Sequence, residues 1–145
     1  MTTPLYIFDL DETLLDGDSA MIWNEFLVEK GLVDSPDFLA EDKRLMALYA
    51  KGELDMEEYL KFAMAPITHL SIEQVAELVE ECVKTRVLGR IFPQAMELIG
   101  TLKSQGHPMI IVSATVSFIV DVVAKQLGIS NSIGIELIEE SGHYT

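Results

Sequence analysis

The chain has 145 residues and a formal net charge of -14, with 10 lysines and arginines against 24 aspartates and glutamates. Because affinity for nucleic acid comes largely from lysine and arginine, this balance argues against a nucleic-acid partner. Apolar residues make up 49% of the chain and charged residues 23%, which is the composition of a folded domain with a core. The single cysteine, Cys82, excludes an intrachain disulfide framework and a cysteine zinc cluster.

The N-terminal residues show no basic segment followed by an apolar run of the signal-peptide type. No apolar stretch approaches the roughly 20 residues that a membrane-spanning helix needs. We therefore expect a cytoplasmic protein that does not bind membranes.

A short apolar run at residues 5–8 predicts a buried parallel strand that stops at Asp9. Asp9 and Asp11 follow at a spacing of two, so strand alternation would place both carboxylates on the same side. A hard divalent cation would relieve their mutual repulsion, and magnesium fits oxygen ligands best. The alternative interpretation is that residues 9–18 only form a loop and cap the next helix.

Helical periodicity then dominates about a hundred residues, which predicts a helical insertion after the first strand. The segments with this periodicity are 19–30, 38–51, 55–64 and 72–86. Several large side chains in them either line an apolar substrate pocket or form the insertion's own core, namely Tyr49, Tyr59, Phe62 and Met64.

The remaining residues predict a return to alternating helices and strands. A helix at residues 94–105 leads to a second buried strand at residues 109–112, which stops at Ser113. A helix at about residues 116–127 and a strand at residues 133–138 follow, before a turn at residues 140–142. Polar residues at the carboxyl ends of parallel strands collect in one crevice, so Asp9 and Ser113 are expected to meet there. Ser113 is alternatively the cap of the helix that follows.

Two motifs carry a family resemblance. Residues 7–14 (IFDLDETL) resemble the first signature of the haloacid dehalogenase (HAD) phosphatases, and residues 110–113 (IIVS) resemble their second signature. The position of the helical block resembles the phosphoserine phosphatase-like branch. The resemblance implies an α/β fold with a Rossmann-like parallel sheet. Residues 1–16 and 88–145 would form the core, and residues 17–87 a helical-bundle cap inserted after the first strand.

The same resemblance implies a mechanism. Asp9 would be the nucleophile that forms an aspartyl-phosphate, and Asp11 would be the general acid and base. Mg²⁺ would be bound by Asp9 and Asp11. Thr13, Ser113 and the backbone N–H at Ala114 would hold the loop and the phosphoryl oxygens.

Two cap residues are candidates for contact with the substrate. Asp18 lies where phosphoserine-type enzymes hold an acidic residue that meets a substrate amine. Those enzymes also use a cap arginine for the substrate carboxylate, which is not found at the corresponding stretch here. Arg44 is the candidate substitute.

HAD enzymes also need a third-signature lysine and a later acidic pair that completes the magnesium shell, and the sequence ends before either. We therefore expect a C-terminally truncated chain with an incomplete sheet, whose exposed edge favours a homodimer. The main hypothesis is a Mg²⁺-dependent phosphomonoester hydrolase acting on a small phosphorylated metabolite. The alternative is a truncated, catalytically inactive HAD domain that binds phosphate or a partner without turnover.

Overall fold

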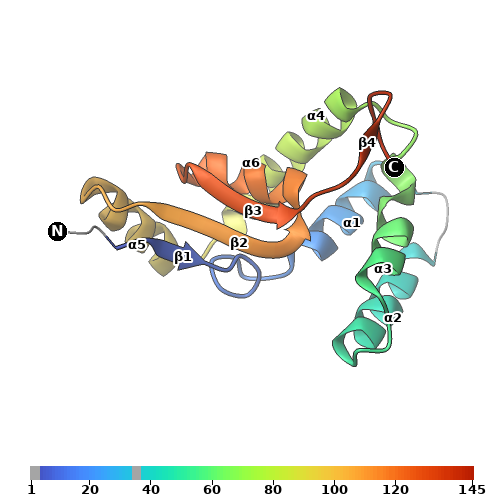
Figure 1. Ribbon diagram of the computed structural model, residues 1–145, viewed down its shortest axis with the longest axis horizontal. Coiled ribbons are helices and arrows are strands. Elements are labelled where there is room, and N and C mark those ends of the chain that lie inside the picture. Colours follow the sequence, from blue (N-terminus) through green and yellow to red (C-terminus); the bar gives the residue numbers. More distant parts are fainter. Residues whose placement is uncertain (1–3, 34–36) are drawn as a thin grey trace.

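The structure is a computed structural model that describes residues 4–33 and 37–145. A parallel sheet in the order β1-β2-β3 forms its centre. The strands are β1 (Tyr6–Phe8), β2 (Met109–Val116) and β3 (Asn131–Ile135). The helices α5 (Pro93–Ser104) and α6 (Ser117–Leu127) lie on one face of this sheet (Figure 1). The α/β class and the parallel sheet predicted from the sequence are confirmed.

The predicted insertion is helical throughout its described part. It contains α1 (Ser19–Glu29), α2 (Phe38–Ala50), α3 (Met56–Met64) and α4 (Ile72–Cys82). A 3-10 turn at Ala65–Ile67 follows α3, and α4 continues through a π-helical turn at Val83–Val87 and a 3-10 turn at Leu88–Arg90. Helix α4 packs against α6, and α1 contacts β2, whereas α2 and α3 pair beyond the end of the sheet (Figure 1). The division of the chain into a core and a cap remains a prediction.

Two strand boundaries differ from those predicted. Strand β2 continues past Ser113 to Val116, and β3 begins at Asn131 and ends at Ile135 instead of running over residues 133–138. Pairing with the neighbouring strand causes both differences, because Asn131 pairs with Ile110 and Ile135 with Val116. Short polar stretches of this kind have weak β-propensity, so periodicity alone does not reveal them. The predicted turn joins the hairpin of β4 (Glu139–Glu140) and β5 (His143–Tyr144).

The core lies between the sheet and its helices. It includes Trp23 and Phe26 from α1, Val79 from α4 and Val120 from α6, all nearly inaccessible to solvent. The opposite face of the sheet carries an exposed apolar strip, which consists of Leu5, Ile7, Val112 and Ile133. No helix in the described part of the chain is long and apolar enough to cross a membrane.

Candidate active site

The loop after β1 is anchored by buried leucines. Leu10, Leu14 and Leu15 are at most 2% exposed, and the backbone N–H of Leu14 donates to the carbonyl of Leu10. Asp9 lies just before this anchor and is exposed, with its Oδ1 accepting from the N–H of Leu10 at 2.7 Å. Thr13 is exposed on the same loop. The nucleophile predicted from the sequence is therefore accessible to a substrate.

Asp11 is half-buried and accepts two hydrogen bonds. The backbone N–H of Ser19 donates to Oδ1 at 2.7 Å, and the hydroxyl of Thr115 donates to Oδ2 at 3.0 Å. Ser19 is the first residue of α1 and Thr115 lies near the end of β2. Asp11 therefore joins the sheet to the first helix of the insertion.

The second predicted motif lies beside the first. Phe8 pairs with Ile111, so Asp9, directly after β1, and Ser113, within β2, lie toward the same end of the two strands. Ser113 is 9% exposed, and its Oγ accepts from the N–H of Thr115 at 3.1 Å. The cap position of α6 is held by Val116 without a side-chain hydrogen bond, so Ser113 does not cap that helix. Strand pairing thus puts Asp9, Ser113 and Ala114 toward the same end of the sheet, and of these three Ala114 lines the pocket described next.

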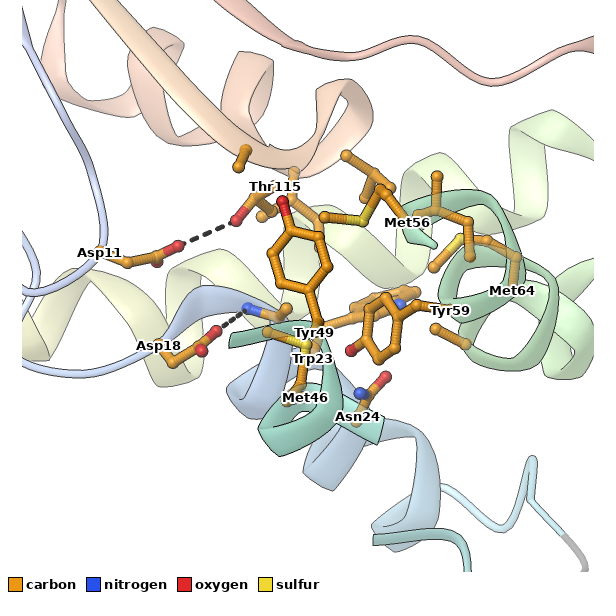
Figure 2. A pocket seen from close by; sticks show the side chains of 16 residues that line it. Asp11, Asp18, Trp23, Asn24, Met46, Tyr49, Met56, Tyr59, Met64 and Thr115 are labelled. Atoms are coloured by element: carbon orange, nitrogen blue, oxygen red, sulfur yellow. Dashed lines mark hydrogen bonds between the residues drawn. The ribbon is translucent and has the colours of Figure 1, made fainter. Parts of the chain in front are cut away.

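A pocket of about 110 Å³ opens between the end of β2 and the helices α1, α2 and α3 (Figure 2). Asp11 and Asp18 lie on one side of it, and aromatic and methionine side chains fill the other (Figure 2). Among the described residues that line the pocket there is no lysine, arginine or histidine. The lining residues are Asp11, Asp18, Ala20, Trp23, Asn24, Met46, Tyr49, Met56, Tyr59, Leu60, Ala63, Met64, Ala114, Thr115, Val116 and Ile119. The pocket is therefore apolar with an acidic end.

Asp18 has two structural roles. Its Oδ1 caps α1 by accepting from the backbone N–H groups of Ala20 at 2.9 Å and Met21 at 3.2 Å. Its side chain also lines the pocket. Burial raises the pKa of Asp18, and the backbone hydrogen bond from Met21 opposes that rise.

Arg44 lies elsewhere. Its side chain is 60% exposed and forms an ion pair with Glu41 at 2.6 Å, and it does not line the pocket. The structure therefore does not bring Arg44 to the other predicted site residues. The reason is helical spacing, since Met46 and Tyr49 on the same helix face the pocket and Arg44 points to solvent.

Four aromatic and methionine residues had two interpretations from the sequence. Tyr49, Tyr59 and Met64 line the pocket, while Phe62 stacks on Phe38 at a centroid distance of 4.9 Å and belongs to the packing of the insertion. No role was predicted for Thr115 or for the hydroxyl of Ser19. Alternation along β2 puts Thr115 on the side of Ser113, and this could have identified it.

Magnesium is the cofactor that the two aspartates suggest. Among residues 4–33 and 37–145 there is no group of three or more histidine, cysteine, aspartate or glutamate side chains that could hold a metal ion. Mg²⁺ is commonly bound by one or two carboxylates, with water and substrate phosphate completing its shell. The exposed carboxylate of Asp9 and the backbone of Asp11 fit such a partial shell.

Comparison with known proteins gives consistent matches over nearly the whole chain. The family model described as haloacid dehalogenase-like hydrolase matches residues 6–145. A histidinol-phosphatase of Neisseria meningitidis is 36% identical over 142 residues, which cover 97% of this chain and 64% of the relative. A phosphoserine phosphatase of Archaeoglobus fulgidus is 30% identical over 141 residues, covering 97% and 36%. The chain thus spans less than two thirds of the length of these relatives.

A solved structure agrees with the fold. A Bordetella pertussis protein of unknown function superposes with a TM-score of 0.86 at 29% identity, over 99% of this chain and 66% of that one.

Proposed function

Since the chain belongs to the haloacid dehalogenase-like hydrolase family, we propose that the protein is a Mg²⁺-dependent phosphomonoester hydrolase acting on a small phosphorylated metabolite. The observation that supports this proposal is the pairing of β1 with β2, which puts Asp9 and Ser113 toward the same end of the sheet, together with the hydrogen bond from Thr115 of β2 to Asp11. An exposed carboxylate, a second carboxylate held by hydrogen bonds and a hydroxyl are thus carried by two neighbouring strands and the loop after β1.

The proposed reaction has two displacements. Asp9 attacks phosphorus, the bond from phosphorus to the alcohol oxygen breaks, and an aspartyl-phosphate forms. Asp11 donates a proton to the departing alkoxide and later accepts one from the water that attacks the aspartyl-phosphate. Inorganic phosphate leaves, and both aspartates return to their initial states.

Two groups of residues assist these steps. The hydroxyl of Ser113, the N–H of Ala114 and Thr13 would hold the phosphoryl oxygens. Mg²⁺, bound by Asp9 and Asp11, would neutralise charge on the phosphoryl group.

The residues that line the pocket suggest which charged groups the leaving alcohol carries. A carboxylate in the leaving group would need a cation, and the described lining residues include none. The acidic end at Asp18 favours an amine instead. Histidinol phosphate, the compound in the name of the Neisseria relative, carries an amine and an imidazole but no carboxylate, whereas phosphoserine carries a carboxylate. We therefore favour an amine-bearing alcohol of the first type.

A second candidate function is phosphate or partner binding without turnover. We further infer that the protein works with a small metabolite, without nucleic acid or membrane, and as a homodimer. A cytoplasmic location remains a prediction of the sequence.

Phosphate release from 4-nitrophenyl phosphate, with and without Mg²⁺, separates the two functions. We expect metal-dependent release that Asp9→Asn abolishes. Release that is equal in the wild type and in Asp9→Asn would contradict the hydrolase, and so would no release from a folded wild-type chain, which would favour the second candidate. Histidinol phosphate and phosphoserine, compared in the same assay, test the choice of alcohol.

A further inference from the structure

Asp11 is held by two donors from segments that are far apart in the sequence. The N–H of Ser19 and the hydroxyl of Thr115 occupy its two carboxylate oxygens, one each (the Thr115 bond is drawn in Figure 2). Ser19 is 1% exposed and Thr115 is 5% exposed. Solvent therefore does not compete for these donors, and the carboxylate has a defined orientation.

The proton positions in this cluster follow from simple counting. While Asp11 is ionised its carboxylate can only accept, so Thr115 donates its single hydroxyl proton to it. The hydroxyls of Ser19 and Thr115 are 2.9 Å apart, so Ser19 must be the donor in that hydrogen bond. The Ser19 hydroxyl thus points its proton at Thr115, which directs the Thr115 proton to Asp11.

The backbone at Thr115 is also braced. Its N–H donates to Ser113 Oγ at 3.1 Å, and the register between β2 and β3 shifts between Val112 and Val116. Gly134 on β3 approaches this segment so closely that a Cβ there would lie 2.8 Å from the carbonyl oxygen of Thr115. The hydroxyl of Thr115 is therefore supported from both its side chain and its main chain.

We propose that Thr115 is a positioning residue that fixes the Asp11 carboxylate for proton transfer to the leaving alcohol. The inference rests on the proposed function and adds to it a residue that the motifs do not supply. General acid catalysis contributes about 10² to 10⁴ in rate, and a shift of about 1 Å in a reacting group costs about 10². An alcohol that leaves poorly needs this proton, whereas a nitrophenolate leaves well without it.

The test compares two substrates at saturating Mg²⁺, 2-aminoethyl phosphate and 4-nitrophenyl phosphate. We expect Thr115→Val to lower kcat/KM about 10- to 100-fold for the alkyl phosphate and less than about threefold for the aryl phosphate. Thr115→Ser keeps the hydroxyl and should restore the alkyl activity to within about threefold of wild type. A loss of equal size on both substrates, or no loss on either, overturns the proposal.

Ser19→Ala is the matched control. It removes the same Ser19–Thr115 hydrogen bond as Thr115→Val, but it retains the backbone N–H of Ser19 and the hydroxyl of Thr115, both of which contact Asp11. Because both direct contacts with Asp11 remain, we expect it to lower kcat/KM for the alkyl phosphate less than Thr115→Val does. A loss on the alkyl phosphate as large as that of Thr115→Val would show that packing of this cluster, and not the contact with Asp11, matters.

Crystal structures distinguish a failure of this inference from a failure of the proposed function. If the wild type releases no phosphate from either substrate, the proposed function fails, and crystal structures of the wild type and Thr115→Val decide the positioning role. The inference requires that the Asp11 carboxylate keep one orientation in the wild type and leave it in the variant. An unchanged orientation in the variant overturns it.

Discussion

The phenol of Tyr59 donates a hydrogen bond of 2.6 Å to Asp42, and both side chains are buried beside the pocket. Asp42 is 1% exposed, so its carboxylate depends on such donors. Burial, together with the hydrogen bond to Asp42 and its charge, raises the pKa of Tyr59. The phenol therefore remains protonated and able to donate at neutral pH.

Tyr59→Phe should destabilise the fold. The variant keeps the ring but removes the hydrogen bond to the buried Asp42 carboxylate, which costs about 1–3 kcal/mol in the free energy of unfolding. Urea unfolding followed by circular dichroism measures this change. Tyr49→Phe is the control, because Tyr49 is 38% exposed, and it should change stability by less than about 0.5 kcal/mol. Equal effects of the two substitutions would contradict a special role for the Asp42 contact.

Gly134→Ala should disturb the segment that carries Ser113 and Thr115. A Cβ at position 134 would lie 2.7 Å from the Cα of Ser117 and 2.8 Å from the Thr115 carbonyl oxygen. Overpacking of this kind costs about 1–3 kcal/mol, to be measured by urea unfolding. Gly100→Ala in α5 meets nothing within 4 Å and should stabilise the helix by about 0.5–1 kcal/mol. A stable Gly134→Ala protein would mean that β3 can move away from this segment.

Asp18→Asn tests the acidic end of the pocket. Asparagine caps helices about as well as aspartate, so stability should change little. Loss of the charge should lower kcat/KM for an amine-bearing phosphate about 10-fold or more, because a hydrogen bond to a charged group contributes about 1.5–3 kcal/mol. Hydrolysis of 4-nitrophenyl phosphate, which has no amine, serves as the reference reaction. An equal loss of kcat/KM on both substrates would show that Asp18 does not recognise the amine.

Cys82 makes stability depend on pH in the alkaline range. Burial raises the pKa of its thiol to about 12, and Arg86 opposes the rise. An unfolded cysteine ionises near pH 8.5, so the unfolded chain binds fewer protons than the folded chain between about pH 8.5 and about pH 12. The free energy of unfolding should fall as pH rises through that window. Cys82→Ala should show a smaller fall between about pH 8 and pH 10.5 than the wild type, and identical slopes would refute the assignment to Cys82.

The exposed strip of Leu5, Ile7, Val112 and Ile133 should promote self-association. Contiguous apolar surface on a sheet face tends to be covered in solution. We expect sedimentation velocity to show a mass that rises with concentration, and Ile133→Glu to shift the protein toward monomer. Leu98→Glu, on an exposed position of α5 outside the strip, should leave the association intact. A wild type that is monomeric at all concentrations would contradict the expected dimer.

The elements that sequence reasoning located well are those with strong periodicity. All four helices predicted between residues 19 and 86 occur within one or two residues of their expected starts, because their apolar faces pack against the core. Asp18 and Ser71 cap α1 and α4 with their side chains. Apolar periodicity and helix caps depend on residues that are close together in the sequence, so both can be recognised from it.

The candidate site was only partly predictable, because some of its contacts join residues that are far apart in the sequence. Asp9, Asp11 and Ser113 follow apolar runs and could be recognised from their own neighbours. The link from Thr115 to Asp11 spans 104 positions and involves a hydroxyl that is common in buried strands. Arg44 shows the converse: the family resemblance suggested it as a substitute for the cap arginine, but its side chain pairs with Glu41 at the surface.

The pairing of Tyr6 with Met109 has a consequence for how the protein folds. The first strand is synthesised early, yet its partner follows only after about a hundred further residues, and closing a loop of that length costs about 4 kcal/mol of chain entropy. High contact order of this kind slows folding. The helices of the insertion can form before β1 pairs with β2, so the hydroxyl of Thr115 reaches Asp11 only once the two strands have come together.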